Sequence, residues 1–193
     1  VLIHDGKRLK ESTTGIDGAY SFHVHASSTY QLEARKPGYC YNVVPGIDQP
    51  AEINIPMTKV PGLDEHTLML TWKSGADLDS YVRAYHGGGA HKHGFVSTIG
   101  YPNKNLANVS LDYDEKDGYG PETMTIGSEQ YESPFVYYIH KHSGEEWGNA
   151  TAKYWNSSCY MEAVSVADAT EKVADGEYWH VLNYTGNGTF IIV

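Results

Sequence analysis

The sequence predicts an all-β protein made of two consecutive β-sandwich domains. Glycine and proline divide the chain into short apolar runs about 8–12 residues apart, a spacing typical of β-sandwiches. Several of these runs alternate apolar and polar residues, and no stretch keeps the period of an amphipathic helix. Charged residues make up 20% of the 193 residues and aromatic residues 12%, which indicates folded domains rather than a disordered chain.

Residues 1–60 form the predicted first domain. Its opening residues look like a strand, and residues 20–25 (YSFHVH) alternate apolar and polar side chains. Residues 30–34 (YQLEA) repeat that alternation, and residues 52–58 (EINIPMT) make another short strand. Residues 59–65 (KVPGLDE) contain turn-forming residues and no periodic pattern, so we expect a linker there.

Residues 66–193 form the predicted second domain. Its turn signals separate enough short strands for two facing sheets. Only residues 160–174 leave room for a short helix. The expected strands cover residues 67–73, 78–85, 93–99, 107–113, 122–126, 134–141, 159–166, 177–183 and 189–193.

Acidic residues gather in two blocks of the second domain, LMLTWKSGADLDSYVR and LDYDEKDGYGPETMTI. Residues two apart on a strand share a face, so we expect Asp77 and Asp79 to point away from Leu78. Like charges at this density repel unless a cation or solvent separates them. The candidate metal ligands, which would meet if the two blocks form neighbouring strands, are Asp77, Asp79, Asp112, Asp114, Asp117 and Glu122.

A bound Ca²⁺ is one interpretation of these carboxylates, because this ion takes roughly six to eight oxygen ligands. The block does not fit an EF-hand, since Thr123 stands where that loop requires its last glutamate. A second interpretation is solvated strand edges and turn-forming aspartates that cap backbone N–H groups. A carboxylate pair that catalyses hydrolysis is a third.

Histidines occur in pairs two residues apart, a spacing that places both rings on one face of a strand and suits Zn²⁺ or Cu²⁺. Exposed side chains explain the same pairs, since the chain has ten histidines. No Gly-x-Ser-x-Gly nucleophile motif occurs. The pairs are His23/His25, His91/His93 and His140/His142.

The four tryptophans fall into two groups. Trp72 and Trp179 lie in alternating segments, so we expect them in the core. Trp147 and Trp155 lie in a polar, Asn-rich context, where they suit the cover of a glycan or of a partner surface.

Five segments match the acceptor pattern for N-linked glycosylation, and all lie after residue 100. They predict a secreted, extracellular glycoprotein carrying N-linked glycans, although these residue types also abound in β-turns. The formal net charge of -10 disfavours nucleic acids and anionic membranes as partners, and no apolar run is long enough for a membrane span. The candidate acceptors are Asn108, Asn149, Asn156, Asn183 and Asn187.

Cys40 and Cys159 lie in different predicted domains. A secretory route permits them to form disulfides. They can join the two domains, pair between chains or stay as buried thiols, and the sequence leaves these alternatives open. The chain opens VLIHDGKRL, without Met or a signal-peptide pattern, so we expect a mature fragment or a chain that starts inside a domain.

The first domain contains TTGIDGAYSFHV (13–24), YQLEARKPGY (30–39) and INIPMT (53–58). With these segments, residues 1–58 resemble the carboxypeptidase-regulatory-like domain, a small prealbumin-type β-sandwich. The resemblance implies an accessory module for folding or adhesion rather than catalysis. It also implies a first strand upstream of Val1, so we expect an open sheet edge that a neighbouring chain's strand completes.

The second domain contains LTWKSGADLDSYV (70–82), LDYDEKDGYGPETMTI (111–126), FVYYIHKHSG (135–144) and EYWHVLNYTGNGTFIIV (177–193). With these segments, of which DGYGPET is the most specific, residues 66–193 are similar to the YfaP-like family of uncharacterised extracellular β domains. HGFVSTIG stands where that family has a His-Val-Tyr run, so the similarity assigns no histidine ligand. It implies a fold and an extracellular setting, and no activity.

These features favour a non-enzymatic, secreted and glycosylated structural or adhesive module, acting as a subunit of a larger extracellular assembly or filament. We expect it to self-assemble, or to join other extracellular proteins, through added strands, while sugars shield the unused edges. A Ca²⁺-dependent, lectin-like binding module is the alternative, with glycans as its partners. A metal-dependent hydrolase is the remaining class.

Overall fold

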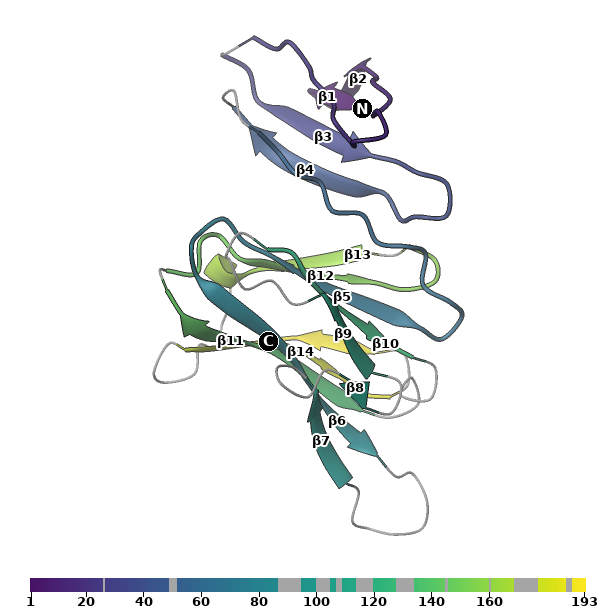
Figure 1. Ribbon diagram of the computed structural model, residues 1–193, viewed down its shortest axis with the longest axis vertical. Coiled ribbons are helices and arrows are strands. Elements are labelled where there is room, and N and C mark those ends of the chain that lie inside the picture. Colours follow the sequence, from purple (N-terminus) through teal and green to yellow (C-terminus); the bar gives the residue numbers. More distant parts are fainter. Residues whose placement is uncertain are drawn as a thin grey trace. The chain divides into compact units, whose positions relative to one another are not determined.

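The computed structural model divides the chain into two compact units, unit 1 (Val1–Val60) and unit 2 (Pro61–Val193) (Figure 1). The described residues form three antiparallel sheets and one short 3-10 helix, η1 (Val166–Asp168), which confirms the all-β prediction. Among them, no helix is long and apolar enough to cross a membrane. The structure describes residues 1–25, 27–48, 52–86, 95–99, 105–106, 109–113, 120–127, 134–144, 146–159, 161–168, 177–186 and 189–193.

Unit 1 contains a four-stranded sheet in the order β2-β1-β3-β4. A tight hairpin joins the first two strands, and the third strand pairs with β1 on one side and β4 on the other. The strands are β1 (Leu2–His4), β2 (Lys7–Lys10), β3 (Tyr30–Ala34) and β4 (Asn42–Ile47).

The core of unit 1 is small, with Leu2, Tyr30 and Leu32 buried. Residues 20–25 pack against it with the predicted alternation, but they are not part of the strand ladder. The predicted strand at 52–58 is likewise outside the ladder. The apolar side chains of both segments pack on the core of unit 1, so alternation predicted which faces are buried without showing whether the segments join the strand ladder.

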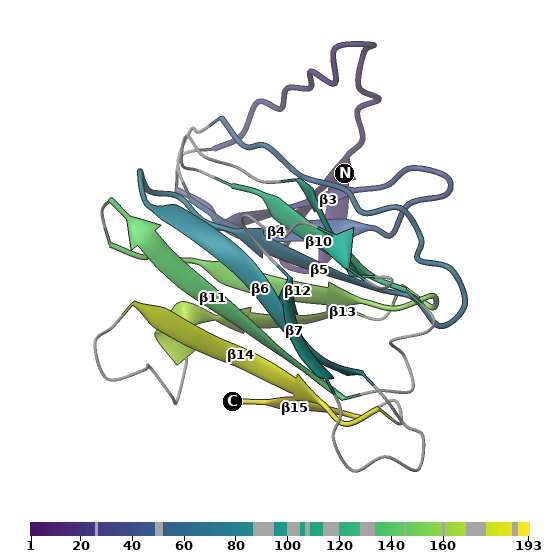
Figure 2. The same cartoon turned by 60° about the horizontal axis from the view of Figure 1, so that its bottom comes forward.

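Unit 2 is a sandwich of a six-stranded sheet, β13-β12-β5-β10-β9-β8, and a five-stranded sheet, β15-β14-β11-β6-β7 (Figure 2). The six-stranded sheet contains β5 (His66–Thr71), β8 (Asn105–Leu106), β9 (Val109–Tyr113), β10 (Glu122–Ile126), β12 (Thr151–Trp155) and β13 (Met161–Ser165). The five-stranded sheet contains β6 (Asp77–His86), β7 (Phe95–Ile99), β11 (Phe135–Ser143), β14 (Tyr178–Tyr184) and β15 (Phe190–Ile192).

Each strand predicted in the second domain has a counterpart in unit 2, within a few residues at the ends. Two described strands of unit 2 were not predicted, the two-residue β8 and β12, which lies between β13 and β5. The segment of β12 (TAKYW) lies between Asn149 and Asn156, in polar surroundings where no strand was predicted. Burial explains the strand, because Ala152 and Tyr154 alternate into the core while β12 pairs with β5 and β13.

The core of unit 2 lies between its two sheets. It contains Leu68 and Leu70 of β5, Met124 of β10, and Leu78 and Val82 of β6, each at most 1% exposed.

The structure also places the tryptophans of unit 2. Trp72 and Trp179 are buried in its core, as predicted. Trp147 and Trp155 are buried too, so neither offers the open platform that their polar context suggested. The ring of Trp147 packs edge-on against Trp179, with ring centroids 6.4 Å apart.

Candidate functional site

The two acidic blocks of the sequence meet in unit 2 at the Trp72 ring. Its Nε1 donates a hydrogen bond to the carbonyl oxygen of Ala76 at 2.9 Å, which closes the turn between β5 and β6. Gly120 lies against the face of the ring, and a Cβ on this residue would come within 2.8 Å of the Trp72 Cε3 atom. Gly120 of the DGYGPET block is therefore needed for the packing of Trp72, which belongs to the first block.

Glu122 is a structural link between the two sheets. It lies on β10 at the same face as Met124 and is 0% exposed. The backbone N–H of Ser80, on β6 of the opposite sheet, donates a 2.7 Å hydrogen bond to its Oε2. Ser80 Oγ lies 3.2 Å from the Tyr137 hydroxyl, and burial of that hydroxyl raises the Tyr137 pKa. This buried polar chain connects β10, β6 and β11.

Asp77 and Asp79 lie on the outer face of the five-stranded sheet. Leu78, between them, points into the core and is 0% exposed, as the alternation predicted. Asp77 Oδ2 lies 3.4 Å from His142 Nδ1. Asp79 lies opposite His140 in the register of β6 and β11, and only 6% of it is exposed. Each of these two carboxylates therefore has a histidine of β11 beside it.

The same outer face carries a set of aromatic rings, which we call the tyrosine-histidine face (Tyr81, Tyr138, Tyr178, His140 and His142). The rings of Tyr81 and Tyr138 stack with centroids 5.3 Å apart, and those of His140 and Tyr178 stack at 4.5 Å. Burial, followed by the charge of Asp79, raises the pKa of Tyr81 to about 12. The rings therefore stack on one another in pairs, and Asp79 on the same face is 6% exposed.

The sequence identified the histidine pair of this face as a candidate site, but not its tyrosines. The alternation of FVYYIHKHSG could have placed Tyr138 on the same side of its strand as His140 and His142. The partner rings on β6 and β14 required knowledge of which strands are neighbours.

Asp112 lies on the exposed face of the six-stranded sheet. Thr125 Oγ1 on β10 donates a 2.6 Å hydrogen bond to its Oδ2, and Ser110 Oγ donates to its Oδ1. Asp114 and Asp117 lie outside the described residues.

The four described carboxylates therefore occupy three separate places: the outer face of one sheet, the core, and the outer face of the other sheet. Strand β6, which carries Asp77 and Asp79, belongs to one sheet, whereas β9 and β10, which carry Asp112 and Glu122, belong to the other, so these four carboxylates do not surround one ion. Within the described part of the chain, no group of three or more His, Cys, Asp or Glu side chains is arranged to hold a metal.

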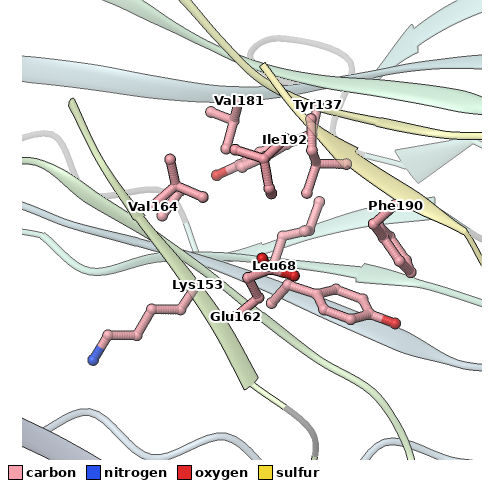
Figure 3. Close-up of a pocket in the computed structure, with 11 residues that line it drawn as sticks. Leu68, Tyr137, Lys153, Glu162, Val164, Val181, Phe190 and Ile192 are labelled. Carbon is pink, nitrogen blue, oxygen red and sulfur yellow. The ribbon is translucent and has the colours of Figure 1, made fainter. Parts of the chain in front are cut away.

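A small apolar pocket lies between the two sheets, near the edge strands β13 and β15 (Figure 3). Its volume of about 10 Å³ is room for about one water molecule. Leu68, Val164 and Ile192 line it, and Figure 3 shows the amino group of Lys153 pointing away from it. The pocket suits a water molecule or a small apolar group rather than a substrate.

The described acceptor asparagines differ in exposure. Asn149 is exposed in the turn before β12, whereas Asn156 and Asn183 are half-buried. Asn156 Oδ1 accepts a hydrogen bond from Ser158 N at 2.9 Å, and Asn183 Oδ1 lies 3.1 Å from His180 Nε2. Asn149 is therefore the most accessible described acceptor. Asn108 and Asn187 lie outside the described residues.

Cys40 and Cys159 are both disulfide-bonded, so neither is a buried thiol. This oxidised state agrees with a secretory route.

Comparisons with known proteins found no relative of this chain. No family model matches the chain, and no curated protein or solved structure is significantly similar to it.

Proposed function

We propose that this chain is a secreted, glycosylated and non-catalytic structural or adhesive module of a larger extracellular assembly or filament. One observation carries the proposal: several of the described residues that suggested chemistry have structural roles within the sheets. Glu122 accepts a backbone hydrogen bond across the sandwich, and Gly120 packs on Trp72. Asp79 is almost fully buried on the sheet face where the rings of Tyr81 and Tyr138 stack, and such packing supports a rigid sheet rather than a reactive site.

The family resemblances support the same proposal. Carboxypeptidase-regulatory-like and YfaP-like domains are both expected as accessory extracellular modules. We infer that unit 1 and unit 2 correspond to these two modules, at residues 1–60 and 66–193. The disulfide-bonded cysteines and the exposed Asn149 fit an oxidising compartment in which N-linked glycans are added.

Expression of the chain through a eukaryotic secretory pathway tests the compartment and the glycans. We expect peptide mass spectrometry to find sugar on Asn149 at higher occupancy than on Asn156 or Asn183. The variant Asn149→Gln should lose one glycan mass, whereas the matched control Thr151→Ser keeps the acceptor pattern and the glycan. A fully unglycosylated secreted chain would contradict the proposal.

Assembly is tested by sizing and electron microscopy of the native protein. We expect oligomers or filaments at high protein concentration. A monomer that recruits no partner under those conditions would overturn the structural role.

A Ca²⁺-dependent binding module is the second candidate, favoured by one observation. Asp112 is exposed on a sheet face and is followed along the chain by Asp114 and Asp117. If these carboxylates bind the ion, CaCl2 at about 100 times its Kd should stabilise unit 2 by about 2.7 kcal/mol relative to EDTA. Thermal unfolding measures the shift. Asp112→Asn should remove it and the exposed control Glu146→Gln should not; an unchanged melting temperature in CaCl2 would dismiss a stabilising site.

A further inference from the structure

The edge strand β15 (Phe190–Ile192) lacks the features that block three other sheet edges of this protein. An unpaired edge invites another strand, and natural proteins commonly block it with charge or proline. Edge strand β2 carries Lys7, Arg8 and Lys10, all exposed, and β4 carries Pro45. Strand β13 carries Glu162. By contrast, β15 has no charged residue and no proline, and the same is true of β7 (FVSTI) at the opposite edge of its sheet and of the two-residue β8.

The backbone of β15 offers hydrogen-bonding groups to a further strand. Val193 N–H donates to Val181 O at 3.2 Å, and Thr185 N–H donates to Thr189 O at 3.1 Å. Alternate residues of an antiparallel strand direct their N–H and C=O groups to opposite sides. Phe190 and Ile192 therefore direct theirs away from β14, where no described strand pairs with β15.

The side chains of β15 match this arrangement. Phe190 and Ile192 line the small pocket between the sheets, whereas Ile191 points to the opposite face and is 51% exposed. An exposed isoleucine at an unblocked edge contributes its apolar area only if another strand covers it.

We propose that β15 is an assembly edge, and that its partner is β15 of a second copy of this chain, paired antiparallel about a twofold axis at Ile191. Phe190 of each copy then faces Ile192 of the other, and these two positions exchange backbone hydrogen bonds. The two Ile191 side chains meet in the pair between them, where Cα atoms are about 4.5 Å apart. Such a contact is self-complementary, as a twofold interface requires.

The net charge of the chain opposes this contact. Each chain has a formal net charge of -10, so two copies repel one another over long distances. We expect dimerisation to strengthen by several fold when NaCl rises from about 0.05 M to about 0.5 M, because salt screens this repulsion.

The inference rests on the proposed role in assembly, and three variants of the whole chain test it by sedimentation equilibrium. Ile191→Lys places a charge at the twofold axis and should weaken dimerisation by at least about tenfold. Ile191→Val keeps an apolar β-branched side chain and should change the Kd by less than about threefold. Thr98→Lys is the control at the opposite edge strand, β7, and should leave the Kd unchanged. Circular dichroism checks that each variant is folded.

Cross-linking tests the register. On air oxidation Ile191→Cys should form a disulfide-linked homodimer, since the two positions face each other, whereas Thr189→Cys should not. Both native cysteines are already oxidised and do not interfere.

The outcomes separate the two proposals. If dimers or filaments persist in Ile191→Lys, or if Thr98→Lys abolishes them instead, the assembly edge lies elsewhere and only this inference fails. If the native chain stays monomeric at high concentration and Ile191→Cys does not cross-link, both proposals fail.

Discussion

Unit 1 and unit 2 use the same strand chemistry with different depths of core. In unit 2, two sheets enclose a continuous apolar core that includes Trp179, Phe135 and Ile139. In unit 1, one four-stranded sheet is covered by segments outside its ladder, and few residues are fully buried. Smaller domains bury a smaller fraction of their surface, so unit 1 depends more on individual tethers.

Two of those tethers are side-chain hydrogen bonds to the 52–58 segment. The Tyr20 hydroxyl donates to Ile53 O at 2.6 Å, and Asn42 Nδ2 donates to Pro56 O at 2.8 Å. The comparison teaches that an alternating sequence is enough to cover a sheet, whereas a second ladder is needed to build a large core.

The largest expected effect comes from emptying the two cores. Trp179→Ala should lower the free energy of unfolding of unit 2 by about 3–5 kcal/mol, because it removes a fully buried indole and leaves a cavity. The counterpart Phe22→Ala should cost unit 1 about 1–2 kcal/mol, since Phe22 is only partly buried. Urea unfolding followed by fluorescence and circular dichroism measures both. Equal losses of unfolding free energy would show that the two cores contribute equally to stability and would contradict the comparison.

The next effect is the pH dependence of unit 2, which has a buried histidine. His66 is 2% exposed and lies among the rings of Tyr154, Tyr184 and Phe190, and Tyr154 Oη lies 2.7 Å from its Nδ1. Burial lowers the His66 pKa from 6.5 to about 4, and the charge of Asp64 opposes that shift. The folded state therefore favours neutral His66. Its contribution is complete above pH 6.5 and is lost as the pH falls through about 4, by about 3 kcal/mol in all.

Urea titrations of unit 2 stability at pH 7, 5.5 and 4.5 check this prediction. Although His66→Phe loses the contact with Tyr154, its stability should fall less steeply between these pH values than that of the natural chain. The exposed control His142→Gln should keep the natural slope. Parallel curves for His66→Phe and the natural chain would show that His66 is not the group responsible.

The smallest effect compares one glycine from each unit. Gly120 and Gly18 both have positive φ, 50° and 75°, so alanine is strained at either position. At Gly120 a Cβ would also meet the Trp72 ring at 2.8 Å, whereas at Gly18 nothing lies within 4 Å. We expect Gly18→Ala to cost about 1 kcal/mol and Gly120→Ala about 2–3 kcal/mol. Thermal unfolding of the two variants measures the difference, and similar costs would remove the packing role of Gly120.

Much of the fold could be predicted because side-chain direction along a strand is a local property. Leu78 is buried between Asp77 and Asp79, and Tyr20, Phe22 and Val24 face the core of unit 1. The position of Glu122 was equally readable, since ETMTI places it on the face of Met124 and Ile126. A carboxylate there looked like a ligand because its partner, the Ser80 N–H, lies 42 residues away.

The sequence by itself determined where most strands lie and which side chains each strand turns inward, because both follow from an alternation within a few residues. The tertiary structure alone decided which strands are neighbours, and this placed Asp77 and Asp79 in one sheet, Asp112 in the other, and Glu122 between the two sheets. Strand pairing joins residues far apart in the chain, through backbone groups that every sequence shares. Which carboxylates, rings and glycines contact one another is therefore decided only when the two sheets have assembled.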